Sequence, residues 1–151
     1  MRIALAVLCV ACAAPVAAED MYPARYARAE AGVAVEVPWL AARIGRTLSG
    51  GALALDLGAG GSFEGRGFLT LTGGLEARAF TRSRVSPFAR AEGGLLSQSR
   101  AGISGVVSLG GGLSLRLDRE WSARAGLMRS LQVSDVLVGP DYAFLGVERR
   151  W

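Results

Sequence analysis

The sequence predicts an all-β fold, an eight-stranded antiparallel up-and-down transmembrane β-barrel. Three observations support this prediction. Short runs with a period-two alternation of apolar and polar residues follow one another along the chain. Most of these runs reach the roughly 9 to 11 residues that a membrane-spanning strand needs, whereas strands of soluble proteins centre on about 5 or 6. The last run ends on an aromatic residue, Trp151, as expected where a closing strand meets the membrane interface.

Residues 1–18 carry the features of a cleaved signal peptide, which would leave a single outer-membrane β-barrel domain over 19–151. Arg2 provides a positive start, an almost unbroken apolar run follows over 3–14, and 16–18 offer the small residues that a signal peptidase requires. The apolar run is about a dozen residues long and falls short of the roughly 20 that a spanning helix needs. We therefore expect export and removal of this segment.

Both cysteines, Cys9 and Cys12, lie inside the predicted signal peptide. The mature chain is therefore expected to have no disulfide and no cysteine metal site. The alternative is a lipoprotein processed at Cys12, because Val10 and Ala11 suit a lipid-attachment box. Against it, Cys9 stands where such a box usually has Leu.

Eight alternating runs, separated by Gly, Ser, Pro or charged turns, are the predicted strands. In order along the chain they cover 28–37, 39–48, 52–61, 67–80, 87–96, 105–117, 121–131 and 142–151. The clearest hairpin joins the sixth run to the seventh through Asp118, Arg119 and Glu120. Helix competes with strand only over 24–31, where Ala, Arg and Glu have high helix propensity.

The connections between these runs form two alternating sets. If Trp151 ends on the periplasmic side, the periplasmic turns are 49–51, 81–86 and 118–120. The outer connections are then Pro38, 62–66, 97–104 and 132–140. An even number of strands places both ends of the chain in the periplasm, as a bacterial barrel requires. The two longest outer connections are the candidates for surface recognition, and no single residue in them stands out.

The alternation separates two faces of different chemistry. One face is apolar, with residues such as Leu55, Leu71 and Leu127. The other face carries nearly all of the strand charge, with seven arginines and six acids. Its charged residues are Arg28, Glu30, Glu36, Arg43, Asp56, Glu76, Arg78, Arg90, Glu92, Arg116, Arg124, Glu148 and Arg150. This face is therefore almost neutral.

If the charged face points inward, its side chains should form an ion-pair network. The interior of an eight-stranded barrel is only wide enough to be filled by side chains, so charges placed there must pair. The predicted members are Arg78, Arg90, Arg116, Arg124, Asp56, Glu76, Glu92 and Glu148. The alternative is a soluble barrel or sandwich in which the charged face is solvated and the Leu face forms the core. Periodicity alone does not separate these alternatives, but strand length and the alternating connections favour the membrane barrel.

Three segments resemble parts of small outer-membrane barrels of the OmpA-like and OmpX/OmpW-like kind. Residues 110–126 resemble the penultimate hairpin of such barrels, and 86–94 resemble the strand that opens with Pro and an aromatic residue. Residues 145–151 resemble the closing strand, with Trp where Phe is commoner. Arg149 departs from the pattern, because that outward position is usually apolar, although an Arg near the interface can snorkel.

The resemblance implies surroundings of outer-membrane lipid and transient recognition by the barrel-assembly machinery. The C-terminal assembly signal would consist of Ala143, Leu145, Val147 and Trp151. The resemblance implies no activity, since members of these families serve as membrane-stabilising proteins, surface binding proteins or narrow conduits.

Composition argues against several other functions. The chain has no His, so a serine nucleophile would lack its usual base, and no catalytic residue is proposed. No cofactor or metal ligand set is evident either. The pI is near 9.8, but arginines and acids alternate without a basic patch, so no nucleic acid partner is expected.

We therefore expect an outer-membrane protein of structural or surface-interaction type, monomeric and without enzymatic activity. One alternative is a narrow channel for small solutes or hydrophobic molecules. Another is a soluble periplasmic barrel that binds lipid in an apolar interior.

Deleting Trp151 should impair assembly more than a change of comparable size in the connections 97–104 or 132–140, because the deletion removes the aromatic anchor of the closing strand. Heat-modifiable gel mobility of membrane fractions measures the folded share. Equal folded shares for the two kinds of variant would contradict the expectation.

Overall fold

The computed structural model describes residues 25–34, 37–62, 67–98, 102–132 and 141–151. The predicted signal peptide with its two cysteines lies outside the described residues. So do Val35, Glu36 and the stretches 63–66, 99–101 and 133–140 of the three longer outer connections.

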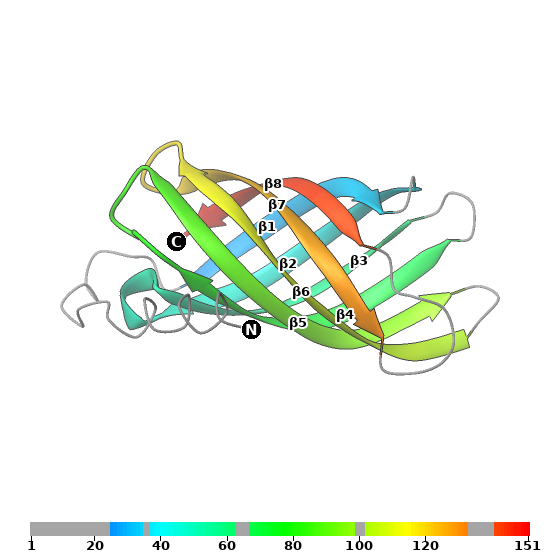
Figure 1. The fold of residues 1–151 in the computed structure, drawn as a ribbon. Helices are drawn as coiled ribbons and strands as arrows, with labels where there is room; N and C mark the ends of the chain where they lie inside the picture. Colours follow the sequence, from blue (N-terminus) through cyan, green and yellow to red (C-terminus); the bar gives the residue numbers. More distant parts are fainter. Residues whose placement is uncertain (1–24, 35–36, 63–66, 99–101, 133–140) are drawn as a thin grey trace.

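The chain forms a closed, all-antiparallel barrel in which each strand pairs with its sequence neighbours and β1 closes against β8 (Figure 1). The strands are β1 (Arg25–Ala34), β2 (Val37–Leu48), β3 (Leu53–Ser62), β4 (Phe68–Arg78), β5 (Val85–Gln98), β6 (Gly102–Arg116), β7 (Trp121–Gln132) and β8 (Tyr142–Arg150). The predicted up-and-down eight-stranded topology is confirmed.

Residues 25–34 form β1, so the predicted strand and not the competing helix is found here, because almost all of this segment pairs with both β2 and β8, and two ladders outweigh helix propensity. Two other local expectations were wrong. Pro38 is not a turn but the second residue of β2, near a strand start, where a missing N–H is tolerated. Much of the predicted loop 97–104 is strand, since Ser97 pairs with Ile103.

The two ends of the barrel differ. One end, called the terminus end below, holds the start of β1, the end of β8 and the short turn of the 3₁₀ segment Ser49–Gly51. Here Arg25 and Trp151 exchange backbone hydrogen bonds, with N···O distances of 3.3 and 3.1 Å. The opposite end, called the loop end below, holds the end of β1 and the starts of β2, β4 and β8 (Figure 1).

The apolar face points outward and the charged face points into the lumen. Leu40, Leu127 and Leu145 are each about two-thirds exposed, whereas Glu76 and Glu148 are completely buried. This arrangement is the inverse of a soluble barrel, whose apolar face would form the core. In the described part of the chain, no helix has the length and apolar character needed to cross a membrane.

Toward the loop end the lumen is filled by apolar side chains. Ala34, Trp39, Phe88, Met128 and Phe144 form one buried cluster. Trp39 meets Tyr142 edge to face with ring centroids 4.7 Å apart, a favourable aromatic geometry. The charged residues therefore occupy the rest of the lumen, between this apolar plug and the terminus end.

Gly94 and Gly93 offer a test of the close packing between β4 and β5. A Cβ on lumen-facing Gly94 would lie 2.7 Å from the backbone Cα of Thr72, whereas one on outward-facing Gly93 would meet nothing closer than 3.7 Å. Gly94→Ala should therefore lower the free energy of unfolding by about 1 to 3 kcal/mol, the usual cost of overpacking. Gly93→Ala is the control and should be close to neutral. Urea unfolding in lipid vesicles measures both values, and equal stabilities would contradict this account.

Candidate functional site

The lumen cluster comprises six arginines and five carboxylates in mutual ion-pair contact. Its members are Arg28, Glu30, Arg43, Asp56, Glu76, Arg78, Arg90, Glu92, Arg124, Glu148 and Arg150, all of them buried. Four strands contribute two members each, spaced two residues apart, because side chains i and i+2 of a strand share one face. The members come from β1 to β5, β7 and β8, so the cluster connects nearly the whole circumference.

Glu148 is the most heavily engaged carboxylate of the cluster. Its Oε2 lies 2.6 Å from Arg28 Nε, 2.8 Å from Arg78 Nη2 and 2.9 Å from Arg124 Nη1. Its Oε1 accepts a hydrogen bond from Arg150 Nε at 2.7 Å. One carboxylate of β8 thus holds arginines from β1, β4, β7 and its own strand.

Glu76 shares three of these arginines. Its Oε2 lies 2.9 Å from Arg28 Nη1 and 2.8 Å from Arg124 Nη2, while Arg78 Nε donates to Oε1 at 2.7 Å. Each of these three guanidinium groups therefore bridges Glu76 and Glu148. Such charge-assisted hydrogen bonds are the strong class, and the planar guanidinium fixes their geometry.

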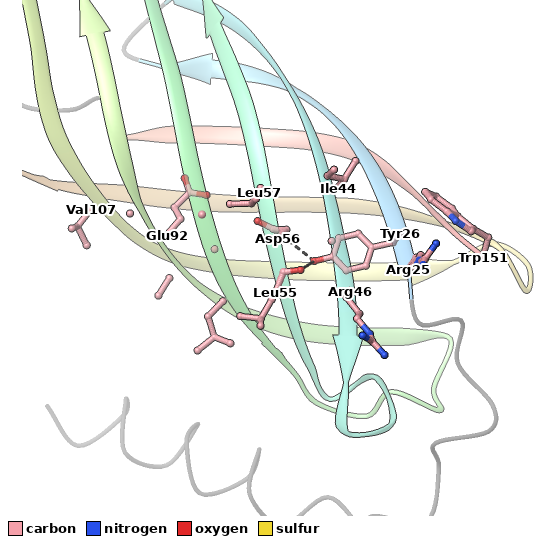
Figure 2. Close-up of a pocket in the computed structure, with 16 residues that line it drawn as sticks. Arg25, Tyr26, Ile44, Arg46, Leu55, Asp56, Leu57, Glu92, Val107 and Trp151 are labelled. Atoms are coloured by element: carbon pink, nitrogen blue, oxygen red, sulfur yellow. Dashed lines mark hydrogen bonds between the residues drawn. The ribbon is translucent and has the colours of Figure 1, made fainter.

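Asp56 links this half of the cluster to the other half. Its Oδ2 is 3.0 Å from Arg28 Nη1, and its Oδ1 is 3.3 Å from both Arg43 Nη1 and Arg90 Nη2. The Tyr26 hydroxyl donates to Oδ2 at 3.1 Å, and Figure 2 shows its ring pointing at this carboxylate. Arg28 also lies over the Tyr26 ring, with Cζ 4.3 Å from the centroid, a cation–π contact.

Glu30 and Glu92 complete the half nearer the loop end. Glu30 binds Arg43 Nε at 3.1 Å and Arg90 Nη1 at 2.9 Å. Glu92 Oε2 lies 2.6 Å from Arg43 Nη2, and Glu92 Oε1 accepts the Tyr142 hydroxyl at 2.5 Å. Tyr142 thus connects the charged cluster to the apolar plug.

Seven of the eight residues predicted for the interior network lie in this cluster. They are Arg78, Arg90, Arg124, Asp56, Glu76, Glu92 and Glu148. The eighth, Arg116, ends β6 at the terminus end of the lumen, where it is half-buried, donates through Nη2 to the carbonyl oxygen of Thr81 and borders the small space that Arg78 and Arg150 also line. Because Arg116 is the last residue of β6, it lies away from the middle of the lumen.

The predicted set omitted several residues that the structure brings in. Arg28, Glu30, Arg43 and Arg150 stand on the same alternating face, so the pattern contained them. The two tyrosines were missed, although Tyr26 precedes Arg28 by two residues and Tyr142 shares the face of Glu148. The period-two alternation would identify both tyrosines if it were applied to uncharged polar side chains as well as to charged ones.

The residues predicted as the assembly signal lie together on the outside of the last strand. Ala143, Leu145 and Val147 point outward from β8, and Trp151 follows it with 55% of its surface exposed. They present an apolar stripe that ends in an aromatic ring.

Two small spaces lie in the lumen beside the cluster, both bordered by described residues. One of about 40 Å³ lies toward the loop end, bordered by residues such as Trp39, Thr72, Glu92 and Tyr142. One of about 10 Å³ lies at the terminus end, between side chains that include Arg78 and Arg150. Sites for organic ligands usually measure roughly 300 to 1,000 Å³, so these spaces fit water and not a substrate.

The described residues contain no group of three or more His, Cys, Asp or Glu side chains placed to hold a metal ion. The carboxylates of the cluster instead face guanidinium groups, which are permanently charged and occupy the positions that a cation would need. The arrangement is therefore a neutralising network.

Comparison with known structures supports the fold assignment. The sequence matches no protein-family model and no curated protein. The fold is similar to the N-terminal β-barrel domain of Pseudomonas aeruginosa OprF, with a TM-score of 0.73 and 17% identity over 84% of this chain and 96% of that one. It is also similar to Neisserial surface protein A, with a TM-score of 0.59 and 15% identity over 84% and 94% of the two chains. The outer membrane enzyme PagL has a TM-score of 0.53 and 15% identity, over 83% of this chain and 99% of that one. The chain thus has the fold of small eight-stranded outer-membrane barrels, a fold that serves enzymes and non-enzymes alike.

Glu148→Gln should destabilise the barrel by about 3 to 5 kcal/mol, because it leaves buried arginines short of a counter-charge. The matched control is Glu120→Gln. Glu120 is 55% exposed and lies 3.2 Å from Arg149 on the outer surface, where a pair is worth about 0 to 1 kcal/mol. Urea unfolding in vesicles gives both values, and a loss at Glu148 no larger than that at Glu120 would refute the role assigned to it.

Proposed function

We propose that this protein is an outer-membrane β-barrel of structural or surface-interaction type, whose lumen is closed by the ion-paired cluster. The observation that carries the proposal is the combination of an apolar exterior with a buried, nearly neutral set of six arginines and five carboxylates. A barrel that faces lipid needs an apolar exterior, and a plugged barrel needs buried charges that neutralise one another.

The membrane location is supported by the outward Leu, Ile and Val side chains. Ile44, Leu57 and Leu71 are each 60% or more exposed. A contiguous apolar surface of this kind is unfavourable in water and favourable against lipid tails. A soluble barrel that binds lipid inside would need the opposite arrangement, because its ligand would meet the charged lumen.

Closure of the lumen is supported by the position of the cluster between the two small spaces. A solute crossing the barrel would have to separate Arg28, Arg78 and Arg124 from Glu76 and Glu148, each bonded at 2.6 to 3.1 Å. Removing one partner from a buried pair costs several kcal/mol, so spontaneous opening is rare. This argument disfavours the narrow channel.

A non-enzymatic role is supported by the chemistry of the side chains. The chain has no His to serve as the base of a serine nucleophile, and the Ser108 and Ser130 hydroxyls bond to one another at 3.1 Å. Similarity to PagL shows only that the fold can carry an enzyme. Any recognition would use the outer connections, and assembly would involve transient contact with the barrel-assembly machinery.

The full chain, refolded into planar lipid bilayers, should give no stable unitary conductance steps, because the ion-paired cluster blocks the lumen. Heat-modifiable mobility of the same preparation is the control that the barrel has inserted. Reproducible steps from an inserted barrel would contradict the closed lumen, and loss of heat-modifiability would contradict the membrane barrel itself.

A further inference from the structure

The outer surface of the barrel carries a furrow that the lumen cluster does not explain. It is an open space of about 970 Å³, with Arg25, Arg46 and Trp151 at one end and Val107 at the other (Figure 2). Its volume lies at the upper end of the range of about 300 to 1,000 Å³ for ligand sites. The furrow is therefore large enough for a lipid chain.

The floor of the furrow is made by two outward-facing glycines. The register places Ile44, Leu57, Gly73, Gly93 and Val107 side by side across β2 to β6. Between the large side chains of this row, Gly73 and Gly93 leave a gap two strands wide. A Cβ on either glycine would meet no atom closer than 3.4 Å, so the packing of the barrel does not demand glycine at these positions.

Two arginines stand at the terminus end of the furrow. Arg25 and Arg46 are direct partners across β1 and β2, and both are exposed. Like charges directly opposite one another destabilise a sheet. Within the ranges that the structure describes, no carboxylate lies within ion-pair distance of either guanidinium group. By contrast, Arg149, outward-facing at the same end, is neutralised by Glu120.

The furrow leads from these charges toward the middle of the barrel. The row that starts with Arg25 and Arg46 continues through Leu55, Leu75 and Ala91. Arg25 is the first residue of β1, whereas Ala91 lies well inside β5. Because strands of a barrel are staggered, the row climbs from the rim into the apolar band. A charged end at the rim and an apolar end at mid-height match the layout of a phospholipid.

We propose that this furrow binds one anionic phospholipid of the leaflet at the terminus end. Arg25 and Arg46 bind its phosphate group, an acyl chain lies over Gly73 and Gly93, and Trp151 packs beside the headgroup. The inference rests on the proposed membrane location. Guanidinium groups suit phosphate because they donate parallel hydrogen bonds, and an aromatic ring at the interface is typical of membrane barrels.

The test refolds the full chain into vesicles of equal phosphatidylglycerol and phosphatidylethanolamine, extracts it in mild detergent, and counts retained lipids by native mass spectrometry. The native chain should retain one phosphatidylglycerol in preference to phosphatidylethanolamine. Arg46→Gln should lower this preference about fivefold, as expected for one arginine near an anionic headgroup. The matched control Arg149→Gln should leave it unchanged.

A second pair of variants tests the acyl-chain part of the furrow. Gly93→Leu should lower lipid retention severalfold by filling the floor, whereas Ala125→Leu, on the outward face of β7, should not. Equal retention in Arg46→Gln and Arg149→Gln, or no preference for phosphatidylglycerol in the native chain, would overturn the proposal. Competition by free glycerol phosphate would also overturn the proposal, because it would indicate a phosphate site without a lipid. A cross-linked dimer that Gly93→Leu abolishes would overturn it as well, because it would indicate that a second copy of the chain occupies the furrow.

Heat-modifiable mobility, measured on every variant, separates the two proposals. If the native chain does not form a heat-modifiable barrel, the proposed membrane location fails. If it forms the barrel but retains lipid independently of Arg46 and Gly93, only the lipid site fails.

Discussion

The lumen of an eight-stranded barrel has room for side chains and little else, so every charge placed there must find its partner across the lumen. Glu148 and Glu76 meet this constraint by sharing Arg28, Arg78 and Arg124, which come from three different strands. The pair between Arg28 of β1 and Glu148 of β8 forms only when the barrel is closed, because it joins the first strand to the last. Closure of the barrel therefore completes the charge neutralisation on which the proposed plugged lumen rests.

The exterior follows from the same alternation. With arginines and acids directed inward, each intervening residue faces outward, and most of these residues are Leu, Val, Ile or Ala. This surface suits lipid, so its few outward-facing arginines need a separate explanation. Arg149 is matched by Glu120. Arg25 and Arg46 have no such match among the described residues, and they lie at the end of the furrow over Gly73 and Gly93, where a lipid phosphate would supply the missing negative charge.

The strand order, the two faces and most of the lumen residues could be predicted from sequence, because alternation has a strict period of two. Strand ends could not. Local propensity predicts a turn at Pro38 and leaves helix as an alternative to strand over 24–31, whereas pairing with neighbouring strands decides both for the described residues. The position of Arg116 depends on stagger between strands, which the alternation does not encode. Tyr26 and Tyr142 carry no charge, so the charge pattern does not identify them. The furrow depends on register, which places Gly73 beside Gly93.

The closed lumen is tested most directly by hydrogen exchange at arginine Nε–H groups, followed by NMR of the barrel in lipid nanodiscs. Arg28 Nε lies 2.6 Å from Glu148 and is completely buried, so its proton should exchange far more slowly than that of exposed Arg46. Equally fast exchange at both arginines would show that water moves freely through the lumen and that the cluster does not close it.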